Sequence, residues 1–374
     1  MNYRLFFTLD YEIHGNGDGN PMSLMVEPTY RLMNLLEEYH QRLTIMADVA
    51  EILCFHRYRE QVGRDDFHVA EIEEQLRDAI RRGHDVQLHI HSSYFKAQWN
   101  GHHFVQYIEE YNMAALPDQR INEMVTECIS YLEQLLRPIK EDYKVWLFRA
   151  ANWSMMPTAN LYRVLVKHGI THDTSVYKDG CQGGNVCYDY REAYDNLYSY
   201  AASSENINRY DPNGLLTELP IYTEMRPFYA FISPIRIFRM VRARFHKHRN
   251  DAVQTSNTAG EKATEERKIQ TIANKNDNRK LTIRSFFVKS PLKMDFNQLR
   301  SSQLITMMKH IQSRTNKGEA VSAAHHTIPL PMLDMADTFP IILIGHAKTF
   351  IPYNETTLRP FLQWIERTFS TEPR

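Results

Sequence analysis

The stretch Phe7-Thr8-Leu9-Asp10-Tyr11-Glu12 ends a short apolar run, residues 5–9, with two acidic side chains. Two later stretches repeat this design: His89-Ile90-His91 follows the run 86–88, and Gly345-His346 follows the run 341–344. Short apolar runs of this kind predict buried strands. If the strands are parallel, their polar ends meet at one rim of a sheet or barrel, where α/β enzymes hold their chemistry.

Strand-like and helical patterns alternate along the rest of the chain. Further strands are expected at 44–48, 145–148, 170–173 and 216–221, and helices at 29–43, 69–82, 119–136, 157–168, 296–315 and 355–368. This alternation predicts an α/β fold, a distorted (β/α) barrel of about seven parallel strands, with an open doubly wound sheet as the alternative. No glycine-rich phosphate-binding motif follows a strand, which weakens a nucleotide-binding interpretation.

Composition restricts the function classes. The chain has 374 residues, of which 43% are hydrophobic and 24% charged, so a soluble protein with a large core is expected. The net charge of −1 gives no indication of nucleic-acid binding. The sequence shows no signal peptide and no apolar run long enough to span a bilayer, and we therefore expect a cytoplasmic protein. Nothing in the sequence indicates the oligomeric state.

One region departs from the repeating pattern. We expect a single domain over residues 1–374, interrupted at 235–290 by a basic helix and a mobile insertion. The helix carries Arg236, Arg239, Arg242, Arg244, Lys247 and Arg249 and no acid, and residues 246–285 contain no aromatic residue. The helix is either a solvated helix packed on the barrel or a contact for a phosphate-bearing substrate or an anionic membrane, at the inner face of that membrane.

The polar strand ends predict a metal site. Side chains two positions apart in a strand lie on the same side, so Asp10 and Glu12 can face one site, and so can His89 and His91. Two imidazoles and one carboxylate form a facial metal site, which leaves the second carboxylate to act as a base. Each pair alone is common by chance, but their joint placement at predicted strand ends favours the metal interpretation.

On these residues the chain resembles the polysaccharide deacetylases of carbohydrate esterase family four, which share the NodB homology domain. The resemblance covers roughly residues 1–204 and 292–350, and it implies a distorted (β/α) barrel with five ordered motifs. The first motif usually has two adjacent aspartates, a base and a metal ligand. Tyr11 holds the second place here, so the resemblance implies Asp10 as the base and Glu12 as the ligand.

The second motif also departs from the usual H-[ST]-x-x-H pattern. His89 matches the first histidine, and Ser93 stands where the second belongs, so the resemblance implies that His91 replaces it. The result is a D-x-E / H-x-H variant. In both motifs the replacing residue, Glu12 or His91, lies two positions after the first residue of the motif.

The remaining three motifs complete the implied site. Arg149, in the stretch 148–154, would contact the base, with Asn152 and Trp153 binding substrate through a backbone N–H and a ring. Asp173 would tune the catalytic histidine, and His346 would be the general acid.

Together these features predict a metal-dependent carbohydrate N-deacetylase. The expected cofactor is a divalent metal, zinc first, with cobalt or nickel as alternatives. The expected partner is an N-acetylated sugar or glycan precursor, in a phosphate- or lipid-linked form if the basic helix binds it. Three alternatives remain: an amide hydrolase acting on a non-sugar substrate, a catalytically silent glycan-binding barrel, and a glycosidase using Asp10 and Glu12, whose placement on one strand suits glycoside cleavage poorly.

Overall fold

The computed structural model describes residues 2–13, 19–227, 230, 289–316 and 338–369. The chain divides into two compact units, Met1–Thr223 with Lys293–Arg374, and Glu224–Leu292. Of the second unit, the structure describes mainly residues 224–227 and 289–292. They belong to a two-stranded sheet of β12 (Thr223–Pro227) and β13 (Lys289–Lys293), whose end residues Thr223 and Lys293 are part of the first unit. The basic helix and the insertion expected within 235–290 lie almost wholly outside the described residues, so both stay predictions.

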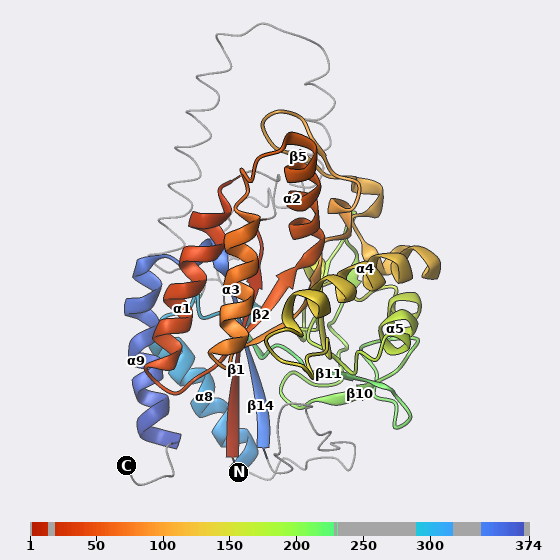
Figure 1. Ribbon diagram of the computed structural model, residues 1–374. Helices are drawn as coiled ribbons and strands as arrows, with labels where there is room; N and C mark the ends of the chain where they lie inside the picture. Colours follow the sequence, from red (N-terminus) through yellow and green to blue (C-terminus); the bar gives the residue numbers. More distant parts are fainter. Residues whose placement is uncertain (1, 14–18, 228–229, 231–288, 317–337, 370–374) are drawn as a thin grey trace, which may run out of the picture. The chain divides into compact units, whose positions relative to one another are not determined.

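Seven parallel strands form the centre of the first unit. In chain order they are β1 (Asn2–Tyr11), β2 (Leu43–Asp48), β3 (Asp85–Ile90), β6 (Leu147–Ala150), β7 (His172–Asp173), β11 (Leu216–Glu218) and β14 (Thr338–His346). Figure 1 labels β1, β2, β11 and β14 among them. Each of the seven pairs with the next along the chain except β11, and β14 pairs back onto β1. The predicted barrel of about seven parallel strands is therefore confirmed.

The sheet curls until its two ends approach each other. Just after β11, Ile221 forms an isolated parallel bridge with Ile342 of β14, and the N–H of Tyr222 donates to the Ile342 carbonyl at 3.4 Å. An eighth strand, β10 (Tyr200–Ala202), adds to β11 in the antiparallel direction. Because the curl gathers the carboxyl ends of the strands, residues from distant parts of the sequence share one rim.

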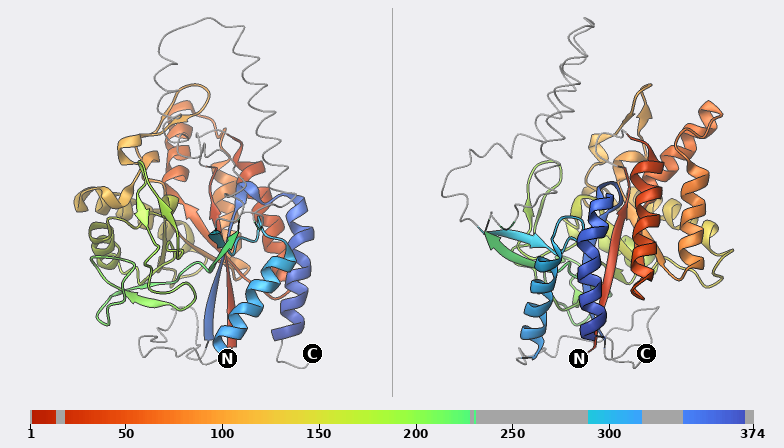
Figure 2. Two further views of the ribbon diagram at one scale, coloured as in Figure 1. Left: turned by 180° about the vertical axis from the view of Figure 1, so that it is seen from behind. Right: turned by 90° about the vertical axis from the view of Figure 1, so that its left-hand side faces the viewer.

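Helices cover the outside of the sheet. They are α1 (Glu27–Glu37), α2 (Val49–Val62), α3 (Val69–Arg81), α4 (Asp118–Leu136), α5 (Thr158–Lys167), α8 (Ser301–Asn316) and α9 (Pro352–Phe369). Figure 2 shows α8 and α9 side by side. Short segments complete the described residues: β4 (Gln98–Trp99), β5 (Phe104–Val105), β8 (Cys181–Gln182), β9 (Tyr188–Asp189), and the short helices η1 (Met22–Val26), η2 (Ser92–Tyr94), η3 (Ile108–Glu110), η4 (Met113–Ala115), η5 (Ala151–Trp153) and η9 (Ala347–Thr349).

Three helices differ from the sequence prediction. Helix α8 begins at Ser301, not at 296. The helix expected at 29–43 ends at Glu37, because His40 turns the chain with a φ of 56°. Helix α2 was not predicted, since its buried face includes the acidic Glu51 beside Ile52 and so lacks a purely apolar stripe. Its first turn is capped by Asp48, whose side chain accepts a hydrogen bond from the N–H of Glu51.

The strands that lead to the rim are buried, so charged side chains in them are unusual. Every residue of β2 and β3 is buried, as expected for parallel strands covered on both faces. A charged residue in such a strand therefore needs a partner, and those at the carboxyl ends find one another. Among the described residues, no helix has the length and apolar character required to cross a membrane.

Candidate active site

The register of the strands sets the layout of the site. Asp10 of β1 is opposite His346 of β14, Asp48 of β2 is opposite His89 of β3, and His89 is opposite Arg149 of β6. These residues lie at the carboxyl ends of five neighbouring strands. The structure thus brings together the acid, histidine and arginine side chains that the sequence placed at one rim.

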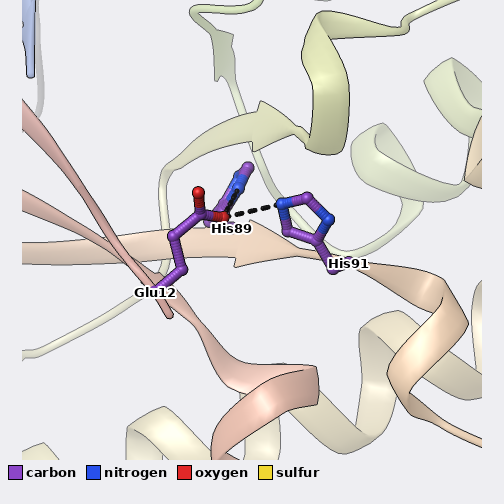
Figure 3. A group of neighbouring side chains, drawn as sticks. All are labelled: Glu12, His89 and His91. Carbon is purple, nitrogen blue, oxygen red and sulfur yellow. Dashed lines mark ion pairs between the residues drawn. The ribbon is translucent and has the colours of Figure 1, made fainter. Parts of the chain in front are cut away.

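Glu12, His89 and His91 form a compact buried group (Figure 3). Glu12 Oε2 lies 2.7 Å from His91 Nε2 and 3.4 Å from His89 Nε2. One candidate ligand atom from each residue falls within 4.8 Å of the others, and all three residues are at most 3% exposed. The group supplies the two-histidine, one-carboxylate set that holds catalytic metals.

The hydrogen bonds around this group fit a cation. The Nδ1 of His89 lies 2.8 Å from the backbone carbonyl of Arg149. A carbonyl can only accept, so this nitrogen carries the proton and Nε2 offers its lone pair to the site. Glu12 Oε2 is buried and faces the Nε2 atoms of His91 and His89. A buried carboxylate oxygen facing two ring nitrogens is a donor set that a small divalent ion satisfies.

Electrostatics also favour positive charge at this position. Burial would raise the pKa of Glu12, but the charges of Lys348 and His91 outweigh it and hold that pKa well below its usual value. Burial lowers the pKa of His89, yet its bond to Glu12 and the charge of Asp10 raise the pKa to about 9. The negative charges of Glu12 and Asp10 therefore favour the protonated form of His89. A bound cation would neutralise the same charges.

A second group, made of Asp10, Arg149 and His346, lies beside the first. Arg149 Nη1 donates to Asp10 Oδ1 at 2.6 Å, and His346 Nε2 lies 3.4 Å from Asp10 Oδ2. Burial would raise the pKa of Asp10, but the charges of Arg149 and His346 lower it. Burial lowers the pKa of His346, although the charge of Asp10 opposes that effect. An ionised carboxylate and an imidazole are thus positioned for proton transfer.

Arg149 is fully buried and held on several sides. Its Nη2 donates to the hydroxyl of Thr8 at 2.7 Å, and its Nε donates to the carbonyl of Thr174 at 3.0 Å. These bonds direct the remaining N–H at Asp10. A guanidinium suits this role because its donors have a fixed planar geometry.

Asn152 and Trp153 line the same cavity in an unusual backbone conformation. Their φ angles are 51° and 65°, the left-handed region that non-glycine residues seldom occupy. The Trp153 ring lies 4.2 Å from Lys293 Nζ, 5.5 Å from Arg149 Cζ and 6.1 Å from the ring of His346. Trp153 therefore contacts cations as well as facing the cavity. The hydroxyl of Tyr190 donates to the Trp153 carbonyl and holds this turn.

The cavity itself measures about 240 Å³. Its lining includes the ligand group Glu12, His89 and His91 and the pair Asp10 and His346. It also includes Ala150, Asn152, Trp153, Gln298, Lys348 and Thr349. The volume is below the roughly 300–1,000 Å³ of pockets that enclose a drug-sized ligand. The cavity thus has room for one small group of a substrate, with the remainder outside it.

Asp173 is placed differently from the role that the family resemblance implies. Its carboxylate accepts hydrogen bonds from the backbone N–H and the hydroxyl of Ser175, at 3.0 and 2.8 Å. The carboxylates whose charges raise the pKa of His346 most are Asp10, Glu12 and Asp295. Both Asp173 and His346 lie in the described part of the chain, and no hydrogen bond or ion pair joins them there, so the implied role of Asp173 stays a prediction.

Two site residues were not identified from the sequence. Asp48 is fully buried, and its Oδ1 accepts from the N–H of His91 at 3.0 Å. It ends a predicted strand, the same signal that selected Asp10 and His89. Lys348 pairs with Glu12 Oε1 at 2.7 Å. It follows His346 by two positions, the same spacing as from Asp10 to Glu12 and from His89 to His91.

Comparisons with known proteins add structural likenesses. No family model matches the sequence, and no curated protein matches it. A protein from Mycobacterium smegmatis described as a polysaccharide deacetylase is 12% identical, with 97% of this chain and 84% of that chain covered and a TM-score of 0.44. The PuuE allantoinase is 11% identical, with 97% and 84% covered and a TM-score of 0.42.

A family 4 carbohydrate esterase from Streptomyces lividans, solved in complex with acetate, is also similar. It is 16% identical, with 46% of this chain and 62% of that chain covered and a TM-score of 0.27. At these identities and TM-scores the likenesses carry no argument about activity.

Proposed function

We propose that the protein is a metal-dependent hydrolase that removes an N-acetyl group from a sugar or glycan precursor. One observation carries the proposal: the buried ligand group of Glu12, His89 and His91 shares a small cavity with the proton-transfer pair Asp10 and His346. Ligands and acid–base groups in one cavity are the two parts that hydrolysis of an amide by activated water requires.

The three ligand residues would hold a divalent ion, for which zinc is the first expectation and cobalt or nickel are alternatives. When bound, such an ion polarises a carbonyl oxygen and lowers the pKa of a water molecule. The chain itself supplies the orientation of the ligands. His89 is fixed by the Arg149 carbonyl, and Glu12 is fixed by Lys348, which engages its other oxygen.

Asp10 would act as the base. Its lowered pKa keeps it ionised at neutral pH, although burial opposes this and Arg149 supplies the compensation. As the water oxygen bonds to the amide carbon, Asp10 takes up the released proton. The separation of 3.4 Å between Asp10 Oδ2 and His346 Nε2 gives that proton a direct path to the imidazole.

His346 would act as the acid. With its pKa lowered by burial, it is neutral before the reaction and receives the proton during it. It then protonates the departing nitrogen as the carbon–nitrogen bond breaks, and acetate and a free amine result. One proton leaves the water and one reaches the amine, so Asp10 and His346 end the cycle as they began.

The turn at Asn152 and Trp153 would bind the negative charge that develops on the carbonyl oxygen. Two successive residues in the left-handed region cost free energy. Such a conformation persists only where the surrounding structure holds it in place. Here the hydroxyl of Tyr190 provides the hold, donating to the Trp153 carbonyl and accepting from the N–H of Met155 at 2.9 Å. A backbone N–H of this turn is our candidate oxyanion donor.

The cavity volume of about 240 Å³ supports a small acyl group as the part that is cleaved. It equally permits an amide hydrolase with a non-sugar substrate, since the same side chains would serve. A phosphate- or lipid-linked substrate also stays a prediction, because the basic residues 236–249 lie outside the described residues.

A substrate panel tests the proposal. Protein loaded with zinc, cobalt or nickel is offered N-acetylated amino sugars, their oligomers, cyclic amides and formamides, and acetate or amine release is measured. Activity on N-acetylated sugars that Asp10→Asn abolishes supports the proposal. Activity confined to non-sugar amides would replace the substrate class, and no activity with any loaded metal would favour the silent glycan-binding barrel.

A further inference from the structure

Asp173 and Glu218 form a pair of buried carboxyl groups on which the charge of Arg149 acts. They are register partners on the adjacent parallel strands β7 and β11, and both are 0% exposed. Residues directly opposite in neighbouring strands point to the same face of the sheet. The fold therefore places two acidic side chains together where water does not reach.

The hydrogen bonds of this pair leave one oxygen without a donor. Both oxygens of Asp173 accept from Ser175, while Glu218 Oε1 accepts from the N–H of Val176 at 3.1 Å. Glu218 Oε2 is buried and has no hydrogen-bond partner. Two ionised carboxylates can only accept, so they cannot satisfy each other, whereas a proton on Oε2 would make it a donor.

The charges around the pair do not offset two negative charges. Arg149 is the cation that acts on both carboxyls, and its donors already bond Asp10, Thr8 and Thr174. The pair also raises the pKa of the phenol of Tyr200, after burial as the larger cause. Like charges in a dry site disfavour double ionisation, as in other carboxylate pairs.

We propose that Asp173 and Glu218 share a single proton at neutral pH and, as a singly charged pair, position Arg149 against Asp10. In agreement, burial and the adjacent Asp173 raise the pKa of Glu218 well above its usual value. The connection to Arg149 is structural. The segment 174–176 is fixed by the pair, and it accepts from Arg149 Nε through the Thr174 carbonyl and from the Ala150 N–H through the Ser175 hydroxyl, at 2.8 Å.

The shared proton has a consequence for stability that does not depend on activity. The folded chain holds a proton that both carboxyls release in the unfolded chain at neutral pH, so stability is lost as pH rises. Glu218→Gln keeps the shape of the protonated acid and removes its titration. Near pH 7, each added pH unit should therefore change the unfolding equilibrium constants of the two proteins by different factors. The factor for the wild type should be up to about ten times the factor for Glu218→Gln.

The catalytic consequence rests on the proposed function. When the pair loses its proton, a second negative charge beside Arg149 competes with Asp10 for the guanidinium. Glu218→Gln should therefore keep kcat/KM close to the wild-type value at neutral pH and lose less activity than the wild type at alkaline pH. Glu218→Ala, which leaves the Val176 N–H unpaired, should lose activity at every pH.

The experiment is a urea unfolding series across neutral and alkaline pH for the wild type, Glu218→Gln and Asp173→Asn, all in one metal state. Glu110→Gln is the matched control, since Glu110 is buried but pairs with Lys96 and Arg120 as an ionised group. We expect Glu110→Gln to unfold at lower urea than the wild type and Glu218→Gln to unfold at a similar concentration.

The outcomes separate the two ideas. Equal pH slopes for the wild type, Glu218→Gln and Asp173→Asn overturn the shared proton whether or not the protein is an enzyme. A steeper wild-type slope supports the shared proton even if no substrate is hydrolysed, in which case only the proposed function fails. A steeper slope with identical kcat/KM–pH profiles for the wild type and Glu218→Gln overturns the positioning of Arg149.

Discussion

The Nδ1 of His89 donates a hydrogen bond to the backbone carbonyl of Arg149 at 2.8 Å, while the side chain of the same arginine donates to Asp10 at 2.6 Å. One residue thus orients a candidate metal ligand through its backbone and the candidate base through its guanidinium. The relationship depends on the parallel pairing of β3 with β6, in which His89 and Arg149 are opposite each other. Arg149 therefore connects the candidate metal site with the candidate base.

Replacing the candidate base should abolish turnover without removing the metal. Asp10→Asn keeps the volume of the side chain but cannot accept a proton, and we expect kcat to fall by about 10²–10⁴. Acetate release measures the rate, and elemental analysis measures the metal content. Glu123→Gln, on the exposed face of α4, is the control and should behave as the wild type. Near-normal turnover in Asp10→Asn would remove the base assignment.

Arg149→Lys should destabilise the protein, although charge is retained. A lysine has no planar set of donors to bond Asp10, Thr8 and the Thr174 carbonyl together, and it leaves buried acceptors unpaired. Breaking a buried ion pair costs about 3–5 kcal/mol, and the lysine charge should reduce that loss to the lower end. Urea unfolding measures the free energy. An unchanged midpoint would show that the arginine bonds contribute nothing.

Lys348→Met should tighten metal binding. The ammonium lies 2.7 Å from Glu12 Oε1, so it repels a cation bound at the other oxygen of the same carboxylate. Glu12→Gln, which removes the ligand charge, should have the opposite effect, and Lys348→Arg should resemble the wild type. Calorimetric titration of the metal-free proteins measures the affinity. Weaker binding by Lys348→Met would mean that orienting Glu12 matters more than charge repulsion.

His172→Phe should reduce the loss of stability in acid. Burial lowers the pKa of His172 to about 4, against an ordinary value of 6.5 in the unfolded chain. The unfolded state alone therefore takes up a proton between these values, so stability is full above pH 6.5 and is lost as pH falls toward 4. A shift of this size amounts to on the order of 3 kcal/mol.

The phenylalanine keeps the edge contact with Trp146, whose ring lies 5.2 Å away, and replaces the unpartnered Nε2 by carbon. Unfolding in urea at about pH 7.5 and about pH 5 compares the two proteins. His84, with a pKa of about 4, and Asp85, with a pKa of about 6, contribute equally to both and cancel. An identical difference between the two pH values in both proteins would refute the prediction.

The sequence predicted the barrel because short, largely apolar runs that end in a polar residue recur along the chain between helical patterns. The same signal located Asp10, His89, Arg149 and His346, and the two-residue spacing located Glu12 and His91. The signal was also present for Asp48, which ends the predicted strand 44–48, but no partner at i+2 accompanied it.

Other features depend on tertiary contacts that no local pattern carries. The pairing of Asp173 with Glu218 arises from the register of β7 and β11, so neither residue indicated the other in the sequence. Helix α2 lacks an apolar stripe because it buries Glu51, whose Oε2 accepts from the N–H of Ile13 at 2.7 Å. In both cases a buried acid is explained only by a partner distant in the chain.

The most direct test of the central claim is the metal content of the purified wild type and of His89→Ala/His91→Ala. It is measured by elemental analysis after separate exposure to zinc, cobalt or nickel and removal of free ion. Circular dichroism of both proteins checks that the double variant remains folded. Our account predicts about one divalent ion per wild-type chain and none in the double variant, because the two imidazoles and Glu12 form the site. A wild type that holds no zinc, cobalt or nickel, or a folded double variant that keeps its ion, would contradict the account.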